Sequence, residues 1–409
     1  MEAQHSLPDY DKTANPDRKS GDNSEKFIPI QPVLPEKDGN FSKRDWLTRY
    51  IYDWAIDKDK TKNVFWLSGG PGIGKTEIIT EFVREHQILK PDLCLDYEKK
   101  KFLILWHFFK DYDEESRKPK NAIQNLTLNL YHESDLIKKN PKFKYNETDF
   151  SEEEHGITLS ALALFNEYIY KPIIDYNINL IIVLDAIDEI SNDEESKTFI
   201  NELVKKIQES DKNLIQLLIT SRTHPRNYDE IKEIFPFSLH STDPRCIDDA
   251  RRYLKFRLKK SLFGQKIRDE DLRKLWHSSQ GNFLYLDLFC FLMEIKGKKS
   301  LIDADYPLGL WNMYIEVFSF LFAIDSTGSF EYYNTSVKPC LAILCEARHP
   351  INYKEFVKIV NENYPKCEIT KLYTEKLAHL FPVSKINGEE VIRPIHHSII
   401  EWLKQKTAP

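Results

Sequence analysis

The stretch that decides the fold spans residues 69–76 and reads Gly69-Gly70-Pro71-Gly72-Ile73-Gly74-Lys75-Thr76. It fits the pattern G-x-x-x-x-G-K-T and stands between an apolar run at 64–67 and a helical pattern at 76–85. Successive backbone N–H groups in such a loop form a nest for phosphate, and glycines let the backbone approach closely. Lys75 is expected to bridge the β- and γ-phosphates, and the Thr76 hydroxyl is expected to ligate Mg²⁺. All eight residues are therefore predicted to bind nucleotide.

Acidic residues follow the apolar run at 180–184, where a buried strand is predicted to end. Open α/β sheets bind ligands at the carboxyl ends of their strands, so this cluster is expected to face the phosphate loop. Asp185 is the candidate carboxylate for Mg²⁺, and Asp188 or Glu189 is the candidate to polarise the attacking water. A solvated acidic turn is the alternative, and the phosphate loop favours the functional interpretation.

Two further positions are candidates for contact with phosphate. The run at 214–220 ends in Thr220-Ser221-Arg222, and Thr220 or Arg222 could sense a γ-phosphate. A surface turn with a solvated Arg222 is a serious alternative. Near the end of the chain stands His396-His397-Ser398. By residue type alone, His396 is more often a structural histidine than a ligand.

The rest of the chain predicts an α/β P-loop NTPase fold followed by two smaller domains. Apolar runs alternate with helical patterns and fall at 64–67, 102–109, 179–184, 214–220 and 235–239, which predicts a parallel sheet covered by helices on both faces. Four helical patterns follow, at 248–260, 269–278, 283–295 and 310–324, and predict an α-helical domain. Helical patterns near 341–347, 353–361 and 374–379, with a hairpin across Asn387-Gly388, predict a winged-helix-like domain.

These patterns divide the chain into five parts. They are a disordered tail at 1–25, an N-terminal segment with a helix at 26–62, a nucleotide-binding domain at 63–240, a helical domain at 241–325 and a winged-helix-like domain at 326–409.

Composition excludes several classes of function. The chain has 409 residues, with 58 Lys+Arg, 64 Asp+Glu and a net charge of −6, so it has no global attraction for nucleic acid. No apolar run approaches the roughly 20 residues of a membrane span, and the polar residues 1–26 do not read as a secretory signal. The six cysteines are scattered, which fits a reducing, cytoplasmic compartment. The basic run Arg251–Lys260 is interpreted as a helix with a solvated face rather than as a nucleic-acid contact.

Together these motifs resemble the STAND class of P-loop ATPases and its NACHT branch. Leu184-Asp185-Ala186-Ile187-Asp188-Glu189 is similar to the NACHT pattern Asp-(Gly/Ala)-x-Asp-Glu, and Thr220-Ser221-Arg222 with Pro225 is similar to the sensor strand. Within the class, the chain most resembles nephrocystin-like and TANC proteins. Three motifs carry this likeness. Phe41-Ser42-Lys43-Arg44-Asp45-Trp46-Leu47 is similar to the family pattern F-x-G-R-x-W-L, except that Lys43 replaces the glycine, and His107-Phe108-Phe109 is similar to a strand ending in His-Phe. His396-His397-Ser398 with Glu401-Trp402-Leu403 is similar to the terminal pattern H-x-S-x-x-E-W-L.

The resemblance implies a signalling switch. ADP would hold the domains closed, with His396 on its β-phosphate. Exchange for ATP would open them and expose a surface for homo-oligomers and protein partners. We further predict that His397, one residue on, points the other way and serves as an internal control for His396. Hydrolysis would be slow and dependent on Mg²⁺. No repeat array follows Leu403, so the chain resembles a bare switch, a truncated relative or a fragment.

A non-hydrolysing, nucleotide-bound interaction scaffold is the alternative. The two hypotheses differ over Asp188 and Glu189, because only the switch needs turnover. A DNA-binding regulator that uses the winged helix is disfavoured by the net charge of −6.

Overall fold

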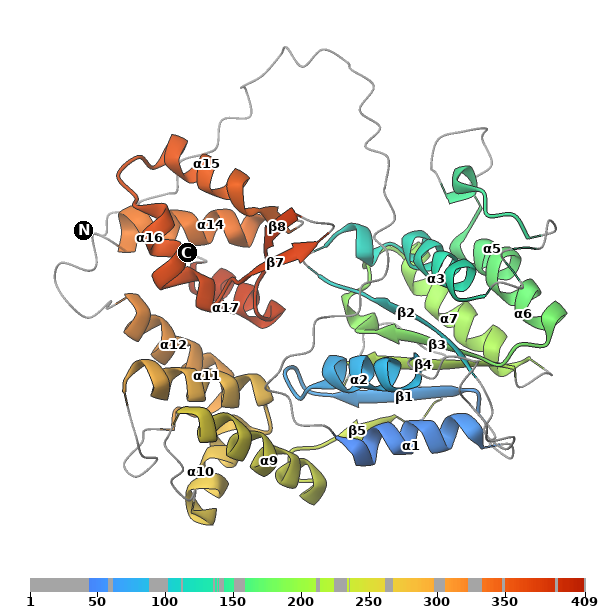
Figure 1. The fold of residues 1–409 in the computed structure, drawn as a ribbon, viewed down its shortest axis with the longest axis horizontal. Coiled ribbons are helices and arrows are strands. Elements are labelled where there is room, and N and C mark those ends of the chain that lie inside the picture. The colour runs from blue at the N-terminus through green and yellow to red at the C-terminus, as the bar shows by residue number, and fades with distance from the viewer. Residues whose placement is uncertain are drawn as a thin grey trace, which may run out of the picture.

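In the computed structural model of Figure 1, an α/β part with helices around a sheet is followed by a helical part and by a smaller part of helices and short strands. The structure describes residues 44–57, 62–87, 102–111, 113–134, 137, 139, 143–150, 159–210, 214–223, 234, 236–261, 268–297, 306–322, 333–347, 350–386 and 389–407. The predicted tail at 1–25, Pro225 and the predicted hairpin turn at Asn387-Gly388 lie outside these residues. The domain boundaries stay a prediction.

The parallel sheet is confirmed. Its strands are β1 (Val64–Gly69), β2 (Leu103–Phe108), β3 (Leu180–Asp185), β4 (Ile215–Ser221) and β5 (Phe237–Leu239). They lie in the order β2-β3-β4-β1-β5, and each neighbouring pair is parallel. Strands β1, β3 and β4 are buried along their whole length, because helices cover both faces of the sheet. Their sequences therefore do not alternate between apolar and polar residues.

Alternate residues of each strand enter two separate cores. Phe65 and Leu67 of β1 join a core that includes α1 (Asp45–Ile56) and α2 (Lys75–Gln87). Val64 and Trp66 join the opposite core. The helices of that second core are grouped in Figure 1, and they are α3 (Pro119–Glu133), α5 (Ala161–Phe165), α6 (Lys171–Tyr176) and α7 (Glu194–Gln208). A π-helical turn at Asn166–Tyr170 joins α5 to α6.

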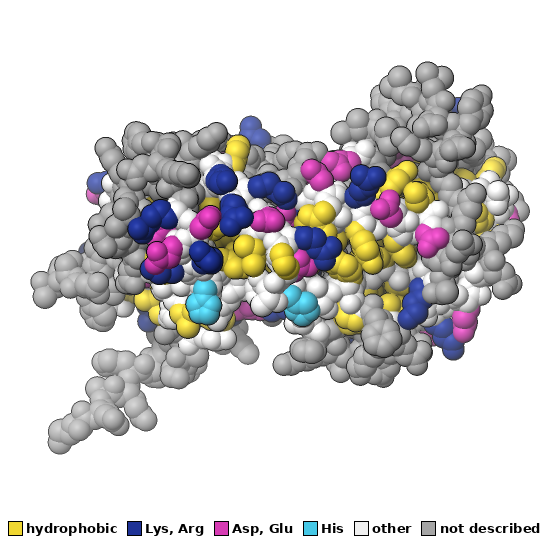
Figure 2. Space-filling model, turned by 90° about the horizontal axis from the view of Figure 1, so that it is seen from below, with side chains coloured by type: hydrophobic (Ala, Val, Ile, Leu, Met, Phe, Trp, Pro, Cys, Tyr) yellow, Lys and Arg dark blue, Asp and Glu magenta, His cyan; other side chains and the backbone are white. Residues whose placement is uncertain are grey.

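The predicted helical segment is confirmed. Its helices are α9 (Pro244–Ser261), α10 (Asp269–Ser279), α11 (Phe283–Ile295) and α12 (Gly309–Phe322). The arginines of α9 are paired with acidic side chains, Arg251 with Asp248 and Arg257 with Asp287. Figure 2 likewise shows basic side chains interspersed with acidic ones on this side of the molecule. These pairs favour the amphipathic interpretation of the basic run.

The last part has the winged-helix-like arrangement. Its elements are α14 (Lys338–Glu346), β6 (Ile351–Asn352), α15 (Tyr353–Asn363), α16 (Ile369–Glu375), β7 (Val383–Ile386), β8 (Glu389–Ile392) and α17 (His397–Thr407). Strands β7 and β8 pair as the predicted hairpin, and β6 pairs with β8. The third predicted helix was placed wrongly, because α16 ends at Glu375 and a separate 3-10 turn covers Leu377–His379.

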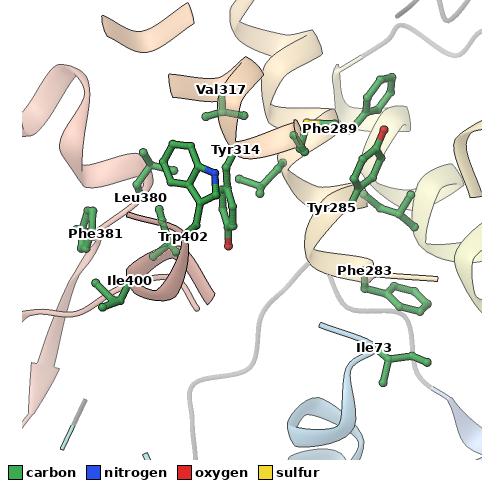
Figure 3. Close-up of a cluster of buried hydrophobic side chains, with 14 of the residues drawn as sticks. Ile73, Phe283, Tyr285, Phe289, Tyr314, Val317, Leu380, Phe381, Ile400 and Trp402 are labelled. Atoms are coloured by element: carbon green, nitrogen blue, oxygen red, sulfur yellow. The ribbon is translucent and has the colours of Figure 1, made fainter. Parts of the chain in front are cut away.

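Apolar side chains join the last two parts. The Trp402 ring of α17 lies 5.5 Å from Tyr314 and 4.7 Å from Phe318, both in α12, measured between centroids. Figure 3 shows Trp402 between Tyr314 and Leu380. This contact packs α17 against α12. Among the described residues, no helix has the length and apolar character to cross a bilayer.

Candidate nucleotide-binding site

The phosphate loop connects β1 to α2, as the sequence predicted. Gly72 and Gly74 adopt φ of 70° and 89°, a region that other residues enter only with strain. Helix α2 begins at Lys75, so its N-terminal N–H groups and its dipole face the loop. The residues from Gly69 to Thr76 therefore form the cradle expected for a phosphate.

Lys75 folds back over this loop. Its Nζ donates to the carbonyl oxygens of Gly69 at 2.8 Å and Gly70 at 3.1 Å. Burial lowers the pKa of Lys75, while the charges of Asp188 and Asp185 oppose the shift. The two carbonyl oxygens are neutral acceptors, so an anionic phosphate would displace them as the partners of Lys75.

The two residues predicted for Mg²⁺ are brought together. Thr76 Oγ1 donates to Asp185 Oδ2 at 2.7 Å, and Thr220 Oγ1 donates to Asp185 Oδ1 at 2.6 Å. Burial raises the pKa of Asp185, and the hydroxyls of Thr220 and Thr76 oppose that shift. Thr220 also accepts from Ala186 N at 2.9 Å, so its hydroxyl orients Asp185 in this conformation.

This pair of oxygen side chains fits Mg²⁺ on a nucleotide. Hydroxyl and carboxylate oxygens are its preferred ligands, and it is ordinarily held by one or two protein groups together with substrate phosphates. No cluster of His, Cys, Asp and Glu within the described residues could cage a metal. The fit therefore depends on phosphate oxygens beside Thr76 and Asp185.

Arg222 is not the solvated surface arginine of the alternative interpretation. Its Nε lies 3.1 Å from Asp188 Oδ2, and its backbone N–H donates to Asp188 Oδ1 at 3.1 Å. Its Nη1 donates to Glu401 Oε1 of α17 at 3.2 Å. Burial lowers the pKa of Arg222, but the charges of Glu401 and Asp188 outweigh burial and raise it.

Glu189 is held close to the same edge. Its Oε2 accepts from the backbone N–H of Asp111, just beyond β2, at 2.9 Å. Burial raises the pKa of Glu189 to about 7, helped by the charge of Asp188 and opposed by the Asp111 N–H. A carboxyl group with this pKa is suited to exchanging protons near neutrality.

His396 is fixed in one tautomer. Its Nδ1 accepts from Ser398 N at 3.1 Å, so its proton is assigned to Nε2. Burial lowers the pKa of His396 to about 4, and the charges of His397, Arg222 and Lys75 add to the effect. The Ser398 hydroxyl lies 2.8 Å from the same Nδ1 and 2.9 Å from Tyr314 Oη. His396 is therefore a neutral group that can donate from Nε2.

His397 is not a bystander, contrary to expectation. Its Nε2 lies 2.8 Å from Asp111 Oδ2 and 3.5 Å from Glu401 Oε1. It therefore joins α17 to the end of β2 and cannot serve as a neutral control for His396.

Three participants carried no assigned role in the sequence analysis. Asp111 and Asn282, whose Nδ2 donates to Pro71 O at 2.8 Å, stand in no recognisable motif, so only the three-dimensional contacts reveal them. Glu401 belongs to the terminal pattern but was given no partner.

A parallel sheet, a glycine-rich phosphate loop and an acidic strand end that holds a threonine hydroxyl define a P-loop NTPase. The family described as Nephrocystin 3, N-terminal, matches residues 43–222. The matched stretch contains the phosphate loop, Asp185 and Arg222. No curated protein matches the chain.

Solved structures resemble the chain distantly. Cdc6p from Pyrobaculum aerophilum is 14% identical with a TM-score of 0.41, over 93% of this chain and 97% of that chain. Drosophila ORC bound to DNA is 13% identical with a TM-score of 0.41, over 91% and 88%. Aeropyrum pernix ORC2, in ADPNP-ADP complexes, is 14% identical with a TM-score of 0.38, over 92% and 95%.

Proposed function

We propose that the protein is a nucleotide-dependent switch of the STAND class, NACHT type, that binds ATP and ADP with Mg²⁺ and hydrolyses ATP slowly. One observation carries the proposal: α17 reaches the edge of the sheet where the phosphate loop lies. Glu401 binds Arg222 there, and His397 binds Asp111. The C-terminal part thus contacts Arg222, the candidate sensor of the γ-phosphate.

Nucleotide binding would use the cradle described above. The backbone N–H groups of Gly72 to Thr76 would hold the phosphates, and Lys75 would exchange its two carbonyl partners for phosphate oxygens. Thr76 and Asp185 would hold Mg²⁺, which supplies neutralising charge to the phosphates.

Switching would follow from competition for Arg222. In this structure its guanidinium contacts Glu401 as well as Asp188. A γ-phosphate is a stronger partner than a half-exposed carboxylate, so ATP would draw Arg222 away from Glu401. A ligand shifts a conformational equilibrium only by its differential affinity, and Arg222 provides that difference. His396 would favour the closed state by donating from Nε2 to the β-phosphate of ADP.

Hydrolysis would rest on Glu189 or Asp188. Glu189 has a pKa of about 7 and is suited to accept a proton from the attacking water. To do so, its carboxylate would first break its hydrogen bond with the Asp111 N–H. Opening of α17 would expose the surface for homo-oligomers or protein partners, and no nucleic acid would be bound.

The non-hydrolysing scaffold remains the second candidate. It is favoured by the engagement of both carboxylates with protein groups, Asp188 with Arg222 and Glu189 with Asp111.

The deciding experiment begins with mass spectrometry of nucleotide released by denaturing the purified protein. We expect ADP or ATP at close to one per chain. Phosphate release is then measured with MgATP for the wild type and Glu189→Gln. Bound nucleotide together with slow phosphate release that Glu189→Gln abolishes supports the switch. Bound nucleotide without phosphate release by the wild type supports the scaffold. No nucleotide and no binding of added ADP refutes both.

A further inference from the structure

The phosphate loop presents a row of carbonyls on the side away from its nest. In a nest the N–H groups converge on the anion, so the carbonyl groups point outward and need partners of their own. Pro71 O accepts from Asn282 Nδ2 at 2.8 Å, Gly72 O accepts from Phe283 N at 2.8 Å, and Ile73 O accepts from Arg44 Nη1 at 2.9 Å. Three consecutive carbonyls are thus held from outside the loop.

Those partners tie the loop to the helical domain. Asn282 and Phe283 stand at the start of α11. Arg44 is itself bound to Asp249 of α9 at 2.7 Å, and their side chains are only 1% and 0% exposed. The loop therefore cannot change shape without disturbing contacts to both α9 and α11.

Side-chain packing reinforces the same junction. Ile73 and Phe283 are both buried, and Figure 3 shows them facing each other across it. A Cβ atom on Gly72 would collide with the Asn282 side-chain amide. Gly72 is thus required for close approach of Asn282 as well as for its φ.

Asn282 has two separable roles. Its Oδ1 accepts from Tyr285 N at 2.9 Å and caps α11, while its Nδ2 donates to Pro71 O. Ser, Thr and Asp cap helices as well as Asn does. A short amide side chain carries its acceptor and its donor on two separate atoms, so Oδ1 can cap α11 while Nδ2 binds the loop, and the cap alone does not explain this choice.

We propose that Asn282 is a positioning residue for the phosphate loop, through which the helical domain keeps the nest shaped for nucleotide and registers its occupancy. The inference rests on the proposed nucleotide binding and deepens it. Because occupied and empty loops would differ in the strength of this contact, nucleotide should in turn stabilise the start of α11.

The test separates the donor from the cap. Asn282→Ser keeps a capping oxygen and loses the amide donor, and Asn282→Asp keeps the cap and places an acceptor against Pro71 O. Losing one hydrogen bond should weaken ADP binding by calorimetry about three- to tenfold in Asn282→Ser, and more in Asn282→Asp. Asn352→Ser is the matched control, because Asn352 caps α15 through Lys354 N and Glu355 N. It should leave ADP affinity unchanged.

Hydrogen exchange of the phosphate loop supplies a second readout, which would not change if Asn282 only capped α11. Without nucleotide, peptides covering residues 69–75 should exchange faster in Asn282→Ser than in the wild type and in Asn352→Ser. With ADP, protection at the start of α11 should rise in the wild type and less in Asn282→Ser.

The two proposals fail differently. Unchanged loop exchange and unchanged ADP affinity in both Asn282 variants would show that this residue is only a cap, and would overturn the inference. Faster loop exchange in Asn282→Ser, with no nucleotide binding by the wild type, would keep the positioning role while refuting the proposed function.

Discussion

The contact between His397 and Asp111 should make the attachment of α17 sensitive to pH. Burial alone would lower the pKa of His397, but the hydrogen bond and charge of Asp111 outweigh it and raise the pKa above the ordinary 6.5. The same hydrogen bond lowers the pKa of Asp111 below the ordinary 3.8. The stabilisation from His397 is therefore complete below pH 6.5 and is lost as pH rises through its raised pKa. On the acid side, the contribution of Asp111 disappears only as pH falls through its lowered pKa.

The size of this stabilisation follows from how far the His397 and Asp111 side chains are exposed. A hydrogen bond to a charged group contributes about 1.5–3 kcal/mol when buried. The side chains of His397 and Asp111 are 14% and 32% exposed, so screening by water reduces this to about 1–2 kcal/mol. Asp111→Asn should therefore lower the free energy of opening α17 by about 1–2 kcal/mol at pH 6, and by progressively less as pH rises through the raised pKa of His397.

Native-state hydrogen exchange of peptides from α17, corrected for the intrinsic pH dependence of exchange, measures this free energy. Burial raises the pKa of Glu189 to about 7, so Glu189 also weakens the folded state as pH rises from 4.5 through 7. Comparing the wild type and Asp111→Asn in a Glu189→Gln background removes that contribution from both pH profiles. His396 has a pKa lowered to about 4 and stays neutral throughout the range. Parallel pH profiles for the wild type and Asp111→Asn would refute the reasoning.

Three further predictions concern the nucleotide. Lys75→Ala should abolish tight ADP binding in calorimetry, because Lys75 supplies the main side-chain charge for the phosphates; equal affinity in wild type and variant would contradict this role. Glu189→Gln should keep ATP binding and suppress phosphate release, since the amide cannot take a proton from water; turnover at the wild-type rate would make Asp188 the candidate. His396→Ala should speed ADP release, followed by stopped-flow fluorescence, by about tenfold to a hundredfold, because a charge-assisted hydrogen bond contributes roughly 1.5–3 kcal/mol. Identical off-rates would mark His396 as structural.

Local sequence patterns sufficed to predict the features that are formed by residues close together in the chain. Strands β1, β3 and β4 read as apolar runs, broken in β4 by the buried Gln216, because both of their faces are buried. Positions 69–76 follow one another in the chain, so their spacing alone predicts the phosphate loop. Asp185 could be found because it ends a strand beside that loop.

Contacts distant in sequence could not be predicted. Asn282 and Pro71 are separated by 211 positions, and Arg222 and Glu401 by 179. No periodicity in either segment specifies such a partner. The two-residue strand β6 is likewise too short to produce a pattern.

The error over His397 has a geometric cause. Opposite directions for neighbouring side chains are a property of extended chain. Helix α17 begins at His397, so the alternation of an extended strand does not apply to His397. In the helix, His397 lies beside Glu401 one turn further on, and it contacts Asp111.

The distance in sequence between the phosphate loop and its outer partners also bears on synthesis of the chain. Asn282 is translated 211 residues after Pro71, which at about 5–20 residues per second is a delay of about 10–40 s. During that interval β1 and α2 can form, but the Pro71 and Gly72 carbonyls lack their helical-domain partners. We therefore expect a nascent chain to acquire nucleotide only after α11 has emerged, so that ligand would stabilise a late stage of folding rather than the first domain made.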